Sequence, residues 1–210
     1  MTSATDKLRQ FWDQRYADAD YAYGRAPNEF LVAQLAHIRA GGEVLCVADG
    51  EGRNSVWLAS QGLQVTAVDI SPQGMNKARA LAQEQGVPLH TEVADLSTYE
   101  MGEARWDAVV SIFLHLPPLL RRSFHARCLR ALKPGGVFIY EAYGDRQSGL
   151  GTGGPKELAL LPPASDVAAD FGAAELIHAY AGLREVREGA LHSGQGYVLQ
   201  FVVRKPSVSR

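Results

Sequence analysis

Short apolar segments of strand length alternate with amphipathic segments from residue 43 onward. Parallel strands need long crossover connections, which are usually helices, so this alternation predicts a parallel sheet covered by helices. The expected strands are Glu43–Ala48, Gln64–Asp69, Leu89–Val93, Trp106–Phe113 and Gly136–Glu141. The expected helices between them are Arg53–Ser60, Pro72–Gln85 and Leu119–Leu132.

The pattern changes after residue 141. A loop rich in glycine and proline (143–155) leads to a short helix, and two long strand candidates follow at Leu176–Val186 and Tyr197–Arg204. Only about ten residues separate them, which suits an antiparallel hairpin at the edge of the sheet. Two helical segments, Asp6–Ala17 and Asn28–Arg39, precede the sheet and flank a linker rich in tyrosine.

The predicted fold is therefore a single α/β domain, residues 1–210, with a Rossmann-like, doubly wound, seven-stranded sheet. The sheet is mostly parallel, with an antiparallel C-terminal hairpin strand. Residues 41–210 form this core, and residues 1–40 form an N-terminal helical arm. The arm either covers the carboxyl edge of the sheet or packs on one of its sides.

Composition narrows the function classes. The chain has 210 residues, 46% of them apolar, and 21 basic against 23 acidic residues give a net charge of −2. This balance provides no drive toward nucleic acid or anionic membranes. No apolar run approaches the ~20 residues of a membrane span, and Met1 to Tyr23 mixes charges and aromatics unlike a signal peptide. We expect a cytoplasmic monomer or homodimer that acts on a small molecule.

No metal site is expected. The two cysteines, Cys46 and Cys128, lie in apolar stretches without CxxC spacing, and the six histidines show no metal-binding pattern. We interpret both cysteines as reduced thiols.

Polar residues follow three successive strands. The first strand runs into a turn with Gly50 and Gly52, where the backbone can approach a ligand and a helix start offers free N–H groups. Asp69 ends the second strand and is placed to accept hydrogen bonds from two ribose hydroxyls. Asp95 follows the third strand, where an adenine amino group could bind. Because these ends converge on one crevice, the sequence predicts a nucleotide-like ligand.

The same residues carry a family resemblance. The turn 48–52, Asp69, the pair Asp95-Leu96, the pair Trp106-Asp107 and the run Leu-Lys-Pro-Gly-Gly at 132–136 make the chain similar to class I S-adenosylmethionine-dependent methyltransferases, from about Phe11 to Lys205. The front segment, with Trp12, Arg15-Tyr16, Tyr23-Gly24 and Pro27-Asn28, resembles small bacterial enzymes related to tellurite-resistance and thiopurine methyltransferases.

The resemblance implies S-adenosylmethionine as cofactor, S-adenosylhomocysteine as product, and a definite set of cofactor contacts. These are Tyr16, Tyr23, Ala48, Asp49, Gly50, Gly52, Asn54, Asp69, Ile70, Asp95, Leu96, Ser111 and Ile112. Two positions depart from the family pattern: Cys46 replaces the usual acidic residue of the first strand, and Ala48 replaces a glycine. Asp49 is the candidate to compensate for the carboxylate missing at 46.

Two histidines are candidates for the chemistry. His115 lies just past the fourth strand, where this fold places the methyl donor, and it is the candidate base; the alternative is a histidine that packs or caps the turn. His192 lies between the last two strands, where a hairpin-loop histidine is more often solvated than turned to the substrate. Tyr16 and Tyr23 either close over the sulfonium with a ring face or simply pack.

Two further patterns have alternative interpretations. The basic residues between Arg121 and Lys133 predict a solvated helix face or, alternatively, a docking patch for RNA or an acidic partner. Gly149, Gly151 and Gly154 have the spacing of a phosphate loop, but no parallel strand with an acidic end follows, so we expect a flexible loop at the substrate mouth.

The sequence thus predicts methyl transfer to a small acceptor by in-line displacement, with a soft sulfur, selenium or tellurium nucleophile as a candidate. The alternative is a relative that binds the cofactor or a partner without transferring methyl groups. A nicotinamide-dependent oxidoreductase is disfavoured by the run at 132–136 and by the terminal hairpin.

Overall fold

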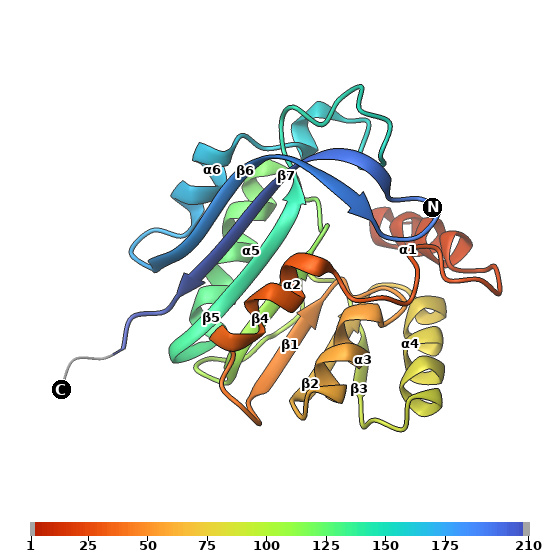
Figure 1. Cartoon of the computed structure of the whole chain (residues 1–210), viewed down its shortest axis with the longest axis horizontal. Coiled ribbons are helices and arrows are strands. Elements are labelled where there is room, and N and C mark those ends of the chain that lie inside the picture. Colours follow the sequence, from red (N-terminus) through yellow and green to blue (C-terminus); the bar gives the residue numbers. More distant parts are fainter. Residues whose placement is uncertain (1–2, 208–210) are drawn as a thin grey trace.

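The computed structural model describes residues 3–207 and shows one seven-stranded sheet with helices on both faces (Figure 1). Residues 1, 2 and 208–210 of the predicted domain lie outside the described residues. The strand order is β3-β2-β1-β4-β5-β7-β6. Their bounds are β1 Glu43–Val47, β2 Gln64–Asp69, β3 His90–Val93, β4 Trp106–Ile112, β5 Leu132–Tyr143, β6 Glu175–Arg187 and β7 Ser193–Arg204.

Strands β1 to β5 run parallel, and β7 pairs antiparallel with both β5 and β6. The predicted Rossmann-like sheet with an antiparallel C-terminal hairpin is confirmed. Strand β5 is longer than predicted at both ends, because Leu132 pairs with Trp106 of β4 and the last residues, 142–143, pair with β7. The hydrogen bonds to β7 thus extend β5 beyond Glu141, where the predicted strand ends.

Each face of the sheet is covered by its own set of helices (Figure 1). The helices are α1 Ala4–Arg15, α2 Glu29–Gln34, α3 Arg53–Ser60, α4 Pro72–Glu84, α5 Pro118–Ala131 and α6 Ala164–Asp170, with short 3-10 turns at Leu35–His37 and Leu158–Leu160. Successive residues of a strand point to opposite faces. Val44 and Cys46 of β1 accordingly pack with α2 and α3, while Leu45 and Val47 pack with α5.

The two halves of the N-terminal arm have different positions. Helix α2 packs Phe30 and Leu31 into the core on one sheet face. Helix α1 buries none of its own residues in the core. It is held over the carboxyl ends of the strands by polar contacts instead: Thr5 donates to Asp95 (2.7 Å), and Asp13 accepts from the Ser71 hydroxyl and the Gln73 backbone N–H.

The linker between α1 and α2 is fixed by one lysine. Lys77 of α4 donates to the backbone carbonyls of Asp18 (2.8 Å) and Asp20 (2.6 Å), and it forms an ion pair with Glu51. The Lys77 ammonium group also lies 4.9 Å from the centre of the Tyr21 ring. These contacts tie the linker to the same edge of the sheet as α1.

Gly52 sets the distance between α3 and α4. Its φ is +91°, and a Cβ added there would lie 2.6 Å from the Cβ of Ala78. An L side chain at this position is therefore opposed by both the backbone conformation and the neighbouring helix.

We expect Gly52→Ala to lower the free energy of unfolding by about 3 kcal/mol, the sum of a left-handed alanine and an overpacked contact. Gly62→Ala is the matched control, because its φ is +81° and no heavy atom lies within 4 Å of the added Cβ. Only the backbone cost of about 1 kcal/mol applies there. Urea unfolding measures both, and equal losses would show that Ala78 does not restrict this turn.

Candidate functional site

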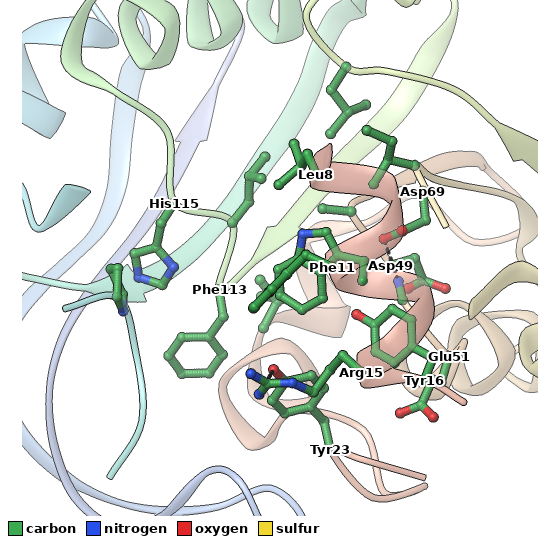
Figure 2. A pocket seen from close by; sticks show the side chains of 18 of the residues that line it. Leu8, Phe11, Arg15, Tyr16, Tyr23, Asp49, Glu51, Asp69, Phe113 and His115 are labelled. Atoms are coloured by element: carbon green, nitrogen blue, oxygen red, sulfur yellow. Dashed lines mark hydrogen bonds between the residues drawn. The ribbon is translucent and has the colours of Figure 1, made fainter. Parts of the chain in front are cut away.

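A cavity of about 660 Å³ opens at the carboxyl ends of the parallel strands, beneath α1 (Figure 2). Most of the predicted site residues line it: Tyr16, Tyr23, Ala48, Asp49, Gly50, Asn54, Asp69, Ile70, Asp95, Leu96, Ile112 and His115. Gly52 and Ser111 do not line it. Gly52 packs against α4, and Ser111 is buried within the sheet between Val47 and Tyr140.

The glycine turn lies directly under the aromatic arm. Gly50 has φ +62°, and a Cβ there would lie 2.7 Å from the Tyr16 hydroxyl oxygen. Tyr16 is almost completely buried over the turn, and its ring stacks on Trp12 at a centroid distance of 5.6 Å. Ala48 adopts φ +50°, the left-handed conformation for which glycine is the usual residue. The turn therefore keeps its shape despite the alanine.

Two acids, Asp49 in the turn and Asp69 at the end of β2, have different partners. Asp69 accepts hydrogen bonds from the backbone N–H groups of Gly50 and Ser71, both at 2.9 Å. Asp49 accepts from the hydroxyl and the backbone N–H of Ser55 in the first turn of α3. Burial raises the pKa of each carboxyl group to about 6. A carboxylate has about four lone-pair sites, so Asp69 retains acceptor capacity on the cavity side.

Cys46 belongs to the core. It is buried with Val44 and Leu58 on the α2 and α3 face, and it does not line the cavity. Burial raises the pKa of its thiol well above the ordinary value, so the side chain is neutral. Cys46 and Cys128 are both free thiols. An apolar contact therefore occupies the position at which the family resemblance implies an acid.

A buried ionic network lies behind the cavity. Glu141, at the end of β5, is fully buried and pairs with Arg184 of β6 (2.7 Å). Glu188, in the β6–β7 connection, pairs with Arg184 (2.8 Å) and with Arg53 of α3. Burial raises the pKa of Glu141, and although burial opposes the charge of Arg184, the bonds to both glutamates raise its pKa. The network joins three elements that are distant in sequence.

Asn28 ties the arm into this network. Its side-chain amide donates to Glu141 (2.6 Å) and Glu188 (2.7 Å), and its backbone N–H donates to the side chain of Asn54 (2.9 Å). Its own side-chain oxygen caps α2 through the N–H of Leu31. Asn28 is thus the N-cap of α2, and the same residue fixes where the arm enters the site.

His115 is engaged within the protein. Its Nε2 accepts a hydrogen bond from the backbone N–H of Tyr143 (3.2 Å), and its ring N–H faces the backbone carbonyl of Phe113. Burial lowers its pKa to about 4. Phe113 has the positive φ of +56° that is uncommon for a bulky residue, and His115 supports this turn. Because its Nε2 already accepts a hydrogen bond, the packing alternative describes His115 better than the role of a base.

His192 is buried, and the expectation of a solvated hairpin-loop histidine is wrong. It is 8% exposed and lines the cavity. Its ring makes edge contacts with Tyr23 (4.6 Å between centroids) and Phe113 (4.9 Å). The hairpin turns inward because the Glu188 N–H bonds the His192 carbonyl (2.7 Å) and Gly189 packs closely against Gly24 of the arm.

The apolar face of α1 and the residue after β4 were not predicted as parts of the site. The unpredicted lining residues include Leu8, Phe11, Trp12, Arg15 and Phe113. One available signal was the helical spacing of Leu8, Phe11 and Trp12, an apolar stripe on a helix that contributes nothing to the core. Leu8 and Phe11 are 49% and 51% exposed, and Figure 2 shows both over the cavity. Such a stripe is typical of a helix that covers a ligand.

The basic stretch is not a continuous solvated face. Arg121 is buried in an ion pair with Asp170 (2.7 Å), and Lys133 pairs with Glu43 and Asp107, both at 2.8 Å. Arg127 donates to backbone carbonyls in the segment 96–99. Arg122 and Arg130 are the exposed members of the set. Most of these charges therefore stabilise the fold.

The glycine-rich loop flanks the cavity. Gly153 and Gly154 line it, and the Tyr143 hydroxyl donates to the Thr152 carbonyl (3.2 Å). Within residues 3–207, no cluster of three or more potential metal ligands occurs. No helix in that range is long and apolar enough to span a membrane.

Comparison with known proteins supports the predicted class. Residues 44–136 match the family model described as a methyltransferase domain. An uncharacterized methyltransferase of Synechocystis sp. is 35% identical over 129 residues, which cover 51% of this chain and 58% of that protein. The chain thus spans less than two thirds of that relative.

Solved structures share the fold over nearly the whole chain. One was reported for the conversion of a disulfide bond into a thioacetal group during echinomycin biosynthesis (TM-score 0.78, 21% identity, 99% of this chain and 93% of that chain). TehB from Haemophilus influenzae is another (TM-score 0.73, 16% identity, 94% of this chain and 66% of that chain). S-adenosylmethionine-dependent methyltransferases are also among the chains with this fold.

The buried network can be tested through Arg184. Removing it leaves Glu141 without its cationic partner, so we expect Arg184→Ala to lower the free energy of unfolding by about 3 to 5 kcal/mol. Arg187→Ala is the control, because Arg187 is exposed on the same strand, and a change within about 0.5 kcal/mol is expected. Chemical denaturation measures both. A similar small change in the two variants would mean that the network adds little to stability.

Proposed function

We propose that this chain is an S-adenosylmethionine-dependent methyltransferase that acts on a small-molecule acceptor. The observation that carries the proposal is the convergence of the Gly50 turn, Asp69 and Asp95 in one cavity beneath an aromatic arm. These groups lie at the ends of adjacent parallel strands, where ligands of open α/β sheets bind. The match to a methyltransferase domain supports the same function.

The described residues fit the parts of this cofactor. Asp69 has free acceptor sites for the ribose hydroxyls, and Asp95, whose second oxygen accepts from Thr5, lies at the adenine end with Leu96. The Gly50 turn and Tyr16 would hold the methionine part. Tyr23 lies at the sulfonium end, where a ring face attracts a cation by about 1 to 2 kcal/mol in a dry site.

The cofactor, when bound, supplies the methyl group and the leaving group. The protein has to align the acceptor with that methyl group and exclude water, which can contribute roughly 7 to 11 kcal/mol. Helix α1 and the loop at 153–154 cover the cavity from two sides. No strongly basic residue is required for an acceptor that is already ionised.

A soft sulfur, selenium or tellurium nucleophile is the first acceptor class that we propose to test. The relation to tellurite-resistance and thiopurine methyltransferases rests on the front segment of the sequence, and TehB is one structural neighbour. The echinomycin neighbour is associated with sulfur chemistry. We place the reaction in the cytoplasm, where the free thiols of Cys46 and Cys128 remain reduced, and expect a monomer or homodimer.

The second candidate is a relative that binds the cofactor without methyl transfer. Cys46 favours it, because the usual acid is absent from β1. Production of S-adenosylhomocysteine with any member of a thiol, selenite and tellurite panel would exclude this candidate.

Asp69→Asn tests the cofactor site. It removes the charge that accepts the ribose hydroxyls, so we expect S-adenosylhomocysteine affinity to fall about 10- to 100-fold, as for the loss of charged hydrogen bonds. Calorimetry on purified protein measures it. Asp166→Ala, an exposed acid of α6, is the control and should bind normally. Unchanged affinity in Asp69→Asn would reject the assignment of Asp69.

Affinity should also depend on pH. The pKa of Asp69 is raised to about 6 by burial, so the group is mostly protonated at about pH 5 and loses acceptor capacity. We expect S-adenosylhomocysteine affinity to fall about tenfold between about pH 7 and about pH 5. The decline should be smaller in Asp69→Asn. Asp49→Asn measures how much of the pH dependence comes from Asp49, because burial raises its pKa to about 6 as well.

The free energy of unfolding of the unliganded protein, measured over the same pH range, is the control for this experiment. A buried carboxyl group with a raised pKa binds its proton more tightly in the folded state than in the unfolded state, where its pKa is the ordinary 3.8. The contribution of Asp69 to the stability of the unliganded protein therefore increases as pH falls from about 6 toward about 4. Loss of affinity that merely follows unfolding would contradict the assignment.

A further inference from the structure

His192 has both ring nitrogens free among the described residues. Its Nδ1 is completely buried without a hydrogen-bond partner, and neither nitrogen has a side-chain or backbone partner in residues 3–207. Leaving a buried polar atom without a hydrogen-bond partner is unfavourable. The His192 ring lines the cavity, and Nε2 is the ring nitrogen that is not fully buried, so a molecule in the cavity can reach it.

The surroundings of His192 define the shape of that group. Aromatic rings of three separate elements surround it: Tyr23 of the arm, Phe113 after β4 and Tyr143 at the end of β5, with ring centroids 4.6, 4.9 and 5.4 Å away. Gly153, which also lines the cavity, lies next to the ring, since a Cβ there would lie 2.6 Å from the His192 ring. Of these rings, Tyr23 and Phe113 also line the cavity, and two aromatic walls suit a flat, apolar body.

The charge of His192 favours a neutral partner. Burial lowers its pKa to about 4, although the carboxylate of Glu188 acts in the opposite direction. The ring is therefore uncharged near pH 7 and offers an unprotonated nitrogen as acceptor. By contrast, the Nε2 of His115 is occupied by the Tyr143 N–H.

Resting on the proposed methyltransferase function, we propose that His192 binds the nucleophilic X–H group of a neutral, planar acceptor, a thiol or phenol, and accepts its proton during methyl transfer. The sulfur or oxygen of the acceptor uses a lone pair to form the bond to the methyl carbon. The bond from that carbon to the sulfonium sulfur breaks, and its electrons stay on S-adenosylhomocysteine. The acceptor proton moves to His192, and the imidazolium releases it to solvent after the products leave.

The test uses the full chain with phenylmethanethiol and phenol as protonated probes and sodium selenite as an ionised probe. We expect His192→Ala to lower kcat for the thiol or the phenol by about 100-fold, the usual contribution of a positioned base. S-adenosylhomocysteine affinity should change less than about threefold, and any selenite turnover should be retained. His90→Ala, which alters an exposed histidine of β3, is the matched control.

Imidazole added to His192→Ala should restore part of the lost rate, a result that a purely structural role would not give. Equal turnover of thiol and phenol in wild type and His192→Ala would overturn the proposal. So would a loss that imidazole does not rescue and that also affects selenite. Failure of the wild type to bind S-adenosylhomocysteine would reject the proposed function itself.

A second measurement covers the case in which none of the probes is methylated. The imidazole signals of His192 in the S-adenosylhomocysteine complex, assigned with His192→Asn, are followed by NMR as phenylmethanethiol or phenol is added. A shift confined to His192 supports the proposal. No shift at saturating concentrations of both probes would overturn it.

Discussion

Two buried glutamates shared between two arginines hold together the edge of the fold at which the cavity opens. Glu141 and Glu188 belong to β5 and to the β6–β7 connection, while Arg53 opens α3 and Arg184 lies on β6. Buried ion pairs add stability only when their remaining hydrogen bonds are satisfied. Asn28 and Gln200 satisfy them here, with donors to Glu141 at 2.6 and 2.8 Å.

The geometry of the cavity follows from this arrangement. Arg53 and its neighbour Asn54 lie at the start of α3, directly after the glycine turn, and Glu188 lies four residues before His192. The network therefore fixes the glycine turn and the His192 side of the cavity relative to each other. Asn28 adds the arm, whose Tyr23 also lines the cavity.

Local sequence pattern was sufficient for the sheet and for most of the cavity lining. Each strand end that was expected to meet a ligand does face the cavity, because the carboxyl ends of parallel strands share one edge. The network was not predictable, since Asn28 and Glu188 are 160 residues apart in sequence. The same holds for His192, whose burial depends on the contact between Gly189 and Gly24. For His115, the position after β4 correctly indicated a residue at the cavity. Its hydrogen bond to the backbone, which occupies the ring nitrogen, could not be predicted from spacing.

Helix α1 contributes no buried residue to the hydrophobic core of the domain. Its apolar stripe faces the cavity, and its attachment to the rest of the chain depends on Thr5, Asp13 and the linker contacts of Lys77. An adenosyl ligand in the cavity would bury that stripe. Ligand binding and docking of α1 would then favour each other. By thermodynamic linkage, a change that stabilises the docked position of α1 tightens ligand binding by the same coupling free energy.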